Sequence, residues 1–423
     1  MEKFIARQPV LDSHRVVYGY ELLFRSGPAN FFPGLNVDLA CTSTADNLFL
    51  FGIERLTRGR RAFINCSHEF LVRDYAMLLP KDRVVIEVLE STSPDDEVVA
   101  ACRRLKNAGY EIALDDFVGA AEWGRLVDLA DCIKVDFLAT PPESQFRFCG
   151  EYTRRNIRML AEKVESYADF ERARDYGYAL FQGYFFSRPE ILTRHDVPAY
   201  KLNYLRVLQA ANRRELDQSE IAEHIKAEAS LSYRLLRYLN SPAFSLVTEV
   251  RSIPHALMLL GERGIRRWVS LVAIACMGED KPQELLLLPL LRARFCELLA
   301  PLADQNSAAS DLFLLGLLSA IDAILDMKME DVLKEIPIRS EIRAALLGEE
   351  NALRRVYDIA LHYERAEWTD FDEMADRLAI RQEIVSDLYV QSMEWAAAVL
   401  AGEEVAGSSL RDCDGPGFSP TGG

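Results

Sequence analysis

The stretch Glu111-Ile-Ala-Leu-Asp-Asp-Phe117 places two adjacent acids at the end of a short apolar run. Gly109 and Gly119 bound the run, and bounded apolar runs of this length are typical of buried strands. A pair of carboxylates at the exit of a buried strand is costly unless something cationic meets it. We therefore expect Asp115 and Asp116 to belong to a site with cationic partners, such as a metal site.

Apolar runs of the same kind recur through the first 190 residues and alternate with amphipathic helical patterns. In the segment 95–108, Val98, Cys102 and Leu105 share one helical face, and Gly109 supplies the stop. This alternation predicts a largely parallel sheet, either open or closed as a barrel. In a (β/α) barrel the strand ends meet on one face, where active sites are built. The apolar runs are 62–65, 84–87, 112–115, 132–136 and 179–182.

The second half of the chain has a helical pattern almost throughout. Asp217 and Glu220 form a capping-box signal, and Ser230 is expected to cap the next helix, which stops at Asn240. This half is therefore predicted to be an all-helical domain. The final stretch, 403–423, is rich in Gly, Ser and Pro and is expected to be a disordered tail.

The composition is ordinary for a globular protein of two or three domains. The formal net charge of -16 at pH 7 argues against general binding to a nucleic-acid polymer or an acidic membrane. Eight cysteines without a Cys-x-x-Cys pair favour free thiols in a reducing cytosol. The N-terminus lacks the apolar core of a signal peptide, and the strongest apolar stretches are too short to span a bilayer. We expect a cytoplasmic protein without membrane insertion.

Polar residues stand where the predicted strands end. Carboxylate and amide oxygens suit hard divalent ions, Mg²⁺ or Mn²⁺, and the lack of His among these residues argues against zinc. Two such ions can clamp a phosphodiester and activate a water, while Lys134 stabilises the developing charge. Any one of these carboxylates, taken alone, is more often solvated or paired with an arginine, so only their joint placement indicates a site. The set is Glu21, Asn65, Glu87, Asp115, Asp116, Lys134, Glu162 and Gln182.

The first 190 residues resemble the EAL domain, whose active members hydrolyse the bacterial second messenger cyclic di-GMP. The resemblance implies a TIM-like (β/α) barrel, and its motifs follow the family's order along the whole first domain. The segments that carry it are Gln8-Pro-Val10, Tyr20-Glu-Leu-Leu-Phe-Arg25, Phe63-Ile-Asn-Cys-Ser67, Ile86-Glu-Val-Leu-Glu90, Ala113-Leu-Asp-Asp-Phe117, Ile133-Lys-Val-Asp136, Ala161-Glu-Lys-Val-Glu165 and Phe181-Gln-Gly-Tyr184.

The same resemblance implies roles for individual residues and a cofactor of two divalent ions, Mg²⁺ or Mn²⁺, if the site is competent. These roles are metal binding for Glu21, Asn65, Glu87, Asp115 and Asp116, catalysis for Lys134, Glu162 and Asp116, substrate binding for Arg25 and Gln182, and anchoring of the loop after Asp116 for Glu90.

Three segments depart from the family's pattern. Val118-Gly-Ala120 stands where active members carry Gly-Thr-Gly, and glycines there allow backbone turns that Val follows only at a cost. Lys163 replaces a Gly beside Glu162, and the segment 26–33 lacks the usual guanine-contacting stretch. These changes slightly favour binding of cyclic di-GMP with weak or absent hydrolysis. The alternatives are an active phosphodiesterase that produces linear pGpG, and an interaction scaffold that needs no nucleotide.

The helical half resembles the HDOD domain, a relative of HD phosphohydrolases that has lost their metal ligands. The resemblance implies a role in protein interaction, with a partner that the sequence does not identify and with a homodimer left open. Ser319-Ala320 stands where HD enzymes carry their His-Asp pair, which argues against a metallohydrolase centre in this half. The chain is thus predicted to combine an α/β and an all-α domain, divided as 1–195 for the EAL-like barrel, 196–402 for the HDOD domain and 403–423 for the tail.

Overall fold

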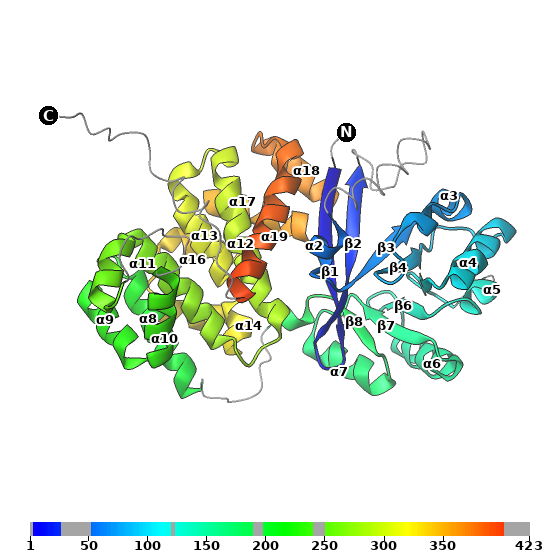
Figure 1. Cartoon of the computed structure of the whole chain (residues 1–423), viewed down its shortest axis with the longest axis horizontal. Coiled ribbons are helices and arrows are strands. Elements are labelled where there is room, and N and C mark those ends of the chain that lie inside the picture. Colours follow the sequence, from blue (N-terminus) through cyan, green and yellow to red (C-terminus); the bar gives the residue numbers. More distant parts are fainter. Residues whose placement is uncertain (1–2, 27–51, 120–122, 189–197, 240–249, 402–423) are drawn as a thin grey trace.

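The computed structural model describes residues 3–26, 52–119, 123–188, 198–239 and 250–401. Its first half is a closed barrel of eight strands, ordered as they follow along the chain (Figure 1). Strand β1 (Lys3–Asp12) runs antiparallel to its neighbours β2 and β8, while the other adjacent strands are parallel. The remaining strands are β2 (Val17–Ser26), β3 (Arg61–Cys66), β4 (Val84–Val88), β5 (Glu111–Leu114), β6 (Cys132–Asp136), β7 (Arg158–Glu162) and β8 (Leu180–Gln182).

Helices α3 to α6 lie on the side of the barrel away from the second domain, whereas α2 lies toward that domain and contacts it (Figure 1). Helix α4 confirms the prediction for 95–108: the side chain of Asp95 accepts a hydrogen bond from the Val98 N–H, and Gly109 ends the helix with a φ of 92°. The helices of this half are α2 (Ile53–Thr57), α3 (His68–Val72), α4 (Asp96–Ala108), α5 (Gly124–Val127), α6 (Pro142–Tyr152) and α7 (Tyr167–Tyr176).

The predicted closed barrel and all-helical second half are confirmed. Among the described residues after Gln182 only helices occur, and Asp217 caps α9 as predicted. The prediction for Ser230 is wrong, because α10 already begins at Ala229 and Ser230 lies inside it. The helices are α8 (Ala199–Asn212), α9 (Gln218–Ala227), α10 (Ala229–Leu239), α11 (Ile253–Met277), α12 (Gln283–Leu299), α13 (Ala309–Leu318), α14 (Ile321–Leu325), α15 (Met329–Glu335), α16 (Ser340–Leu346), α17 (Ala352–Glu364), α18 (Trp368–Arg377) and α19 (Val385–Ala401).

The two halves pack against each other through β1 and β2. Helices α17 and α19 contact β1 (Figure 1). The Ile5 N–H donates a hydrogen bond to the Tyr363 hydroxyl at 3.3 Å, and the Tyr20 hydroxyl donates one to Glu284 Oε1 at 2.6 Å. One hydrophobic core runs through both halves, so the interface is built like a domain interior.

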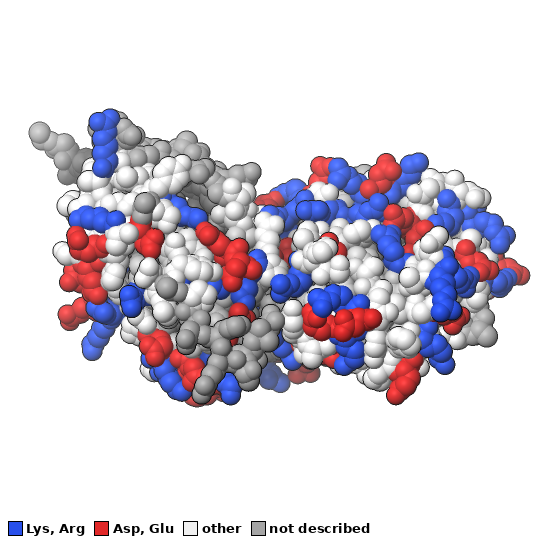
Figure 2. All heavy atoms as spheres, turned by 90° about the horizontal axis from the view of Figure 1, so that it is seen from below, with Lys and Arg blue, Asp and Glu red and all other residues white. Residues whose placement is uncertain are grey.

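No helix in the described ranges is both long and apolar enough to cross a membrane. The described cysteines are buried free thiols, as predicted. On the face seen in Figure 2, Lys and Arg are interspersed with Asp and Glu over both halves. The predicted domain boundary at 195 and the predicted tail 403–423 lie outside the described residues.

Candidate functional site

The site is a polar layer on top of an apolar layer inside the barrel. One buried apolar residue from each of seven strands forms a separate core cluster. Side chains two positions apart in a strand point to the same face, so in the parallel strands β3 to β8 the residue two further on lies directly above that cluster. In six strands that residue is polar: the pairs are Phe63 and Asn65, Val85 and Glu87, Ala113 and Asp115, Cys132 and Lys134, Leu160 and Glu162, and Leu180 and Gln182.

Lys134 stands at the centre of this layer, with its side chain only 1% exposed. Its Nζ lies 2.8 Å from Glu87 Oε1, 2.9 Å from Asp115 Oδ1, 2.8 Å from Glu162 Oε1 and 3.3 Å from Glu21 Oε2. Burial lowers the pKa of the amine, but the four carboxylates outweigh burial and hold the pKa above its usual range. One ammonium is thus shared by four carboxyl groups, an excess of three acidic groups over basic ones.

This excess is visible in the carboxyl groups themselves. Burial raises the pKa of Glu87 well above its usual range, and Lys134 offsets the rise only in part. Burial raises the pKa of Glu162 in the same way. Burial also acts to raise the pKa of Glu21, but Lys134 and the hydrogen bonds from Gln182 and Asn65 prevail and lower it. The site therefore holds more acid than its own lysine neutralises.

Several oxygens in this layer are buried and have no hydrogen-bond donor. Asn65 Nδ2 donates to Glu21 Oε1 at 2.8 Å, and Gln182 Nε2 donates to Glu21 Oε2 at 2.6 Å, which leaves both amide oxygens free. Buried oxygens without partners are rare and need an explanation. Free oxygens next to an excess of carboxyl groups fit hard divalent cations, which take oxygen ligands. The unpartnered atoms are Asn65 Oδ1, Glu87 Oε2, Asp116 Oδ1 and Gln182 Oε1.

Asp116 faces a different cation from Asp115. Lys163 Nζ lies 3.8 Å from Asp116 Oδ2 and is hydrogen-bonded to Asp136 Oδ2. Lys163 has a left-handed backbone with a φ of 54°, which is a conformation that a glycine adopts at lower cost. Burial, with help from Asp115, raises the pKa of Asp116. A fixed ammonium thus stands beside the carboxylate that was expected to hold a second ion.

The structure corrects two predictions about this region. Glu21 does not end its strand, because β2 continues to Ser26; it points into the barrel from mid-strand opposite Phe63. The cost expected at Val118 is not there either, since Val118 is exposed and its φ is not positive. The left-handed residues of that loop are Asp116, with a φ of 38°, and Gly119, with a φ of 81°.

Two predicted residues are not among those that form the polar layer in the described part of the chain. Arg25 is in β2, but its side chain and the segment 27–33 lie outside the described part of the chain. Glu90 follows β4 at the rim of the cleft above the site. The loop that Glu90 was expected to anchor is described only as far as Gly119.

A cleft of about 1060 Å³ opens above the polar layer. Its second wall comes from the helical domain, which sequence reasoning did not connect to this site. Because those residues follow the barrel by more than a hundred positions, no local signal could have placed them there. They are Arg292, Ser319, Tyr357, Leu361, Arg365, Ala366, Glu367 and Trp368.

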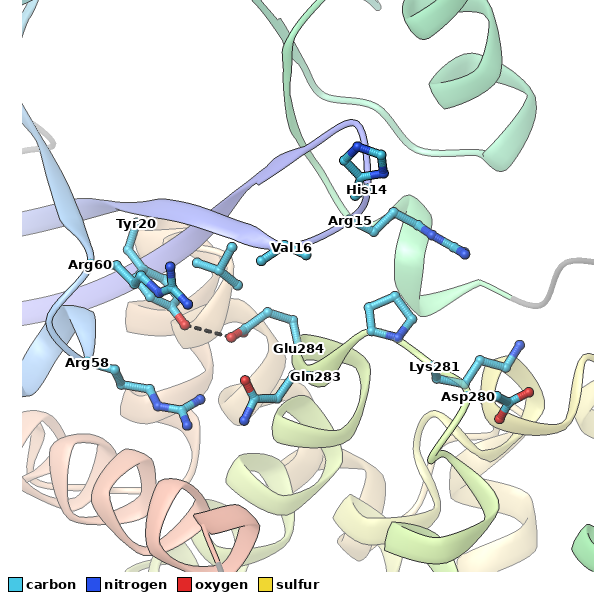
Figure 3. Close-up of a pocket in the computed structure, with 12 residues that line it drawn as sticks. His14, Arg15, Val16, Tyr20, Arg58, Arg60, Asp280, Lys281, Gln283 and Glu284 are labelled. Carbon is cyan, nitrogen blue, oxygen red and sulfur yellow. Dashed lines mark hydrogen bonds between the residues drawn. The ribbon is translucent and has the colours of Figure 1, made fainter.

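A second cavity, of about 480 Å³, lies between the turn from β1 to β2 and the start of α12 (Figure 3). The hydrogen bond from Tyr20 to Glu284 crosses it, and Arg15 and Lys281 point away from that bond. None of the predicted site residues lines this cavity. Its basic side chains do not converge on one point, so the first cleft is the candidate site.

The helical domain has a polar cluster of its own. It includes Ser319, which stands where HD enzymes carry their His-Asp pair. Arg292 donates to Glu364 through Nε at 2.8 Å and through a terminal nitrogen at 2.7 Å, and both side chains are buried. Its other terminal nitrogen lies 3.3 Å from Ser319 Oγ. Nearby, burial raises the pKa of Asp322 to about 6. Charge is matched one to one in the arginine pair, so it requires no ion.

Comparison with known proteins agrees with this architecture. An EAL domain model matches residues 65–189, and an HDOD domain model matches residues 197–356. The fold and the site thus define a protein with an EAL barrel followed by an HDOD domain.

Two relatives extend the match over nearly the whole chain. The Bacillus subtilis protein YuxH is 32% identical over 404 residues, which cover 93% of this chain and 98% of YuxH. The Vibrio cholerae cyclic di-GMP phosphodiesterase CdgJ is 32% identical over 399 residues, covering 93% of this chain and 92% of CdgJ. The chain therefore belongs to the bacterial EAL–HDOD family of signalling proteins. A solved complex of Klebsiella pneumoniae BlrP1 with calcium and cyclic di-GMP is 23% identical, with a TM-score of 0.38 over 45% of this chain and 56% of BlrP1.

Proposed function

We propose that this chain is a cytoplasmic cyclic di-GMP signalling protein whose barrel binds the nucleotide with divalent ions and hydrolyses it weakly or not at all. The HDOD domain, 196–402, mediates interaction with a protein partner. The observation that carries the proposal is the buried oxygen layer around Lys134, in which four carboxyl groups contact a single ammonium. Such a layer is suited to Mg²⁺ or Mn²⁺, and through them to a phosphodiester.

In this site each side chain has a distinct task. Glu21, Asn65, Glu87 and Asp115 hold the first ion, and Asp116 holds the second. When bound, the ions supply positive charge next to the phosphodiester and make a water more acidic. Lys134 keeps the carboxylates together, because its Nζ contacts four of them.

Hydrolysis opens the ring by attack of a water oxygen on phosphorus and loss of the ribose 3′ oxygen. The water's proton goes to a carboxylate, and the leaving oxygen gains a proton. Glu162 is suited to accept the water's proton, because burial raises its pKa. Gln182 orients Glu21 through the hydrogen bond at 2.6 Å.

Slow turnover follows from Lys163. Its ammonium, 3.8 Å from Asp116 Oδ2, competes with a second divalent ion for the same carboxylate. A site that holds only one ion firmly can still bind the nucleotide, but it lacks the second ion that would assist displacement at phosphorus.

An active phosphodiesterase is the second candidate. It is favoured by the complete set of oxygen donors and by the name of the 32% identical Vibrio relative. A scaffold that binds no nucleotide is the third candidate.

The deciding experiment incubates the purified chain with cyclic di-GMP and Mn²⁺ and measures binding by calorimetry and linear product by chromatography. We expect saturable binding with little or no product, and loss of binding in Glu21→Ala. The control is Glu151→Ala, an exposed acid on α6, which leaves binding unchanged. Rapid product formation that depends on Glu21 establishes the phosphodiesterase instead. If the chain neither binds nor hydrolyses the nucleotide, the proposal is wrong and the scaffold stands.

A further inference from the structure

The corner between α17 and α18 forms the wall of the cleft that faces the oxygen layer. Leu361 lines the cleft from α17, Trp368 from α18, and Arg365 and Glu367 from the turn between them. A ligand seated on the oxygen layer in this cleft therefore meets the helical domain as well as the barrel.

This corner is fixed to the barrel by contacts on both sides of it. The Tyr184 hydroxyl, just after β8, donates to the Glu364 carbonyl oxygen at 3.5 Å. The ring of Phe4 in β1 lies 5.9 Å from that of Trp368, and the Tyr363 hydroxyl accepts from the Ile5 N–H at 3.3 Å. The contacts with the barrel therefore make this wall a fixed part of the cleft.

Arg365 is the arginine of the cleft with the loosest ion pair among the described residues. Its closest acid is Glu367, at 4.0 Å, whereas Arg188 and Arg292 lie 3.0 Å and 2.7 Å from their carboxylates. Glu367 is also the acceptor for His362 Nδ1 at 2.7 Å, so its carboxylate is shared between His362 and Arg365.

The guanidinium of Arg365 is also held next to an aromatic ring and is accessible to solvent. Its carbon lies 5.6 Å from the centre of the Tyr184 ring, and 41% of the side chain is exposed. Stacking on an aromatic ring limits the orientations of a guanidinium, and a limited orientation lowers the cost of binding. Arg365 is thus held at the rim of the cleft with guanidinium N–H donors available to a ligand.

We propose that the helical domain supplies Arg365, within the same chain, to bind a phosphate of the cyclic dinucleotide. The inference rests on the proposed function, since the ligand is the nucleotide that the barrel binds. A ligand with two phosphodiester groups beside an acidic layer needs cations on more than one side. A guanidinium suits this role because it can donate two parallel hydrogen bonds to one phosphate.

This arrangement gives the HDOD domain a direct route to the nucleotide. A partner that shifts the corner between α17 and α18 changes nucleotide affinity, and by linkage the nucleotide changes affinity for that partner to the same degree. No separate relay between the domains is required, because one residue belongs to the helical domain and lies in the cleft.

The test compares calorimetric binding of cyclic di-GMP, with Mg²⁺ present, to the full-length wild type and three variants. Arg365→Ala should weaken binding about tenfold or more, the loss expected for a hydrogen bond to a charged group. Arg365→Lys, which keeps the charge but loses the two-pronged geometry, should fall in between. Arg377→Ala on α18, whose side chain is 74% exposed and pairs with Glu373, is the matched control and should bind like the wild type.

Thermal unfolding and Mn²⁺ binding of each variant separate a local effect from misfolding. We expect both to match the wild type in Arg365→Ala, while nucleotide affinity falls. Wild-type affinity in Arg365→Ala overturns the inference and leaves the proposed function intact. Equal losses in Arg365→Ala and Arg377→Ala also overturn it, because the effect is then not specific to the cleft. If the wild type itself binds no nucleotide, the proposed function fails and the inference with it.

Discussion

The barrel mouth and the helical domain bury charge in opposite ways. At the barrel mouth, Lys134 meets four carboxylates, and buried oxygens remain without partners. In the helical domain, Arg292 meets Glu364 in a two-pronged pair, and Ser319 takes a further contact. The first arrangement has four carboxyl groups for one ammonium, and the second pairs its two charges one to one. The difference distinguishes the candidate ion site from a polar cluster that supports the fold.

The largest effect is expected from Lys134→Met. The change keeps the length of the side chain but leaves four buried acids without a cation, which should cost about 5 kcal/mol of unfolding free energy without metal. Mn²⁺ should restore a large part of that loss, because the ion replaces the missing charge. Denaturant unfolding with EDTA and with Mn²⁺ measures both. A loss that Mn²⁺ does not reduce contradicts the assignment of the oxygen layer to metal binding.

Arg292→Met should cost slightly less, about 4 kcal/mol, because it leaves the single acid Glu364 buried and unpaired. Here Mn²⁺ should give no recovery, while the double variant with Glu364→Leu should regain most of the stability. The same unfolding assay checks this, with Arg377→Met as the exposed control. Recovery of Arg292→Met by Mn²⁺ breaks the contrast between the two regions.

Asp322 is the one acid of the helical cluster that behaves like the barrel acids. Its pKa of about 6 lies above the ordinary value of 3.8, so ionised Asp322 destabilises the fold above pH 6, and the penalty disappears as pH falls toward 4. Asp322→Asn should therefore raise unfolding free energy by about 2 kcal/mol at pH 8 and change it little at pH 4. Unfolding curves at both pH values measure this; an equal change at both contradicts the pKa assignment.

The smallest effect on stability is expected for Lys163→Gly. Glycine relieves the backbone at a φ of 54°, but the ion pair with Asp136 is lost, so unfolding free energy should stay within about 1 kcal/mol. Mn²⁺ affinity and the rate of linear product should both rise, because Asp116 becomes free for a second ion. Lys163→Asn, which tolerates the same φ without the charge, should act in the same direction. Unchanged Mn²⁺ affinity in both variants shows that Lys163 does not limit the site.

Much of the barrel and its polar layer could be predicted because the strands β3 to β8 repeat a local pattern. The step from Phe63 to Asn65, or from Leu160 to Glu162, is an apolar residue followed two places later by a polar one. Because side chains alternate between the two faces of a strand, both residues of each pair point into the barrel, and the polar ones together form a layer. Glu21 breaks the rule about strand ends, since β2 extends beyond it to pair with β1, and strand length is set by the neighbouring strand.

The contribution of the helical domain could not be predicted from the sequence. Arg365 follows no motif, and its place in the cleft depends on the packing of α17 against β1. Packing between domains is a property of the assembled surface and leaves no spacing signal along the chain. The start of α10 at Ala229 was missed for a simpler reason: Ser230 is a good cap residue, and the helix runs past it.

The central claim, that the oxygen layer binds divalent cations, is tested most directly by titrating Mn²⁺ into the chain and counting the free ion by electron paramagnetic resonance. The wild type should bind Mn²⁺ saturably. Glu87→Gln, which keeps the shape of a fully buried side chain but removes its charge, should weaken that binding at least about tenfold. Glu151→Gln on the barrel surface should bind like the wild type. No saturable binding by the wild type, or equal binding by Glu87→Gln, contradicts the claim.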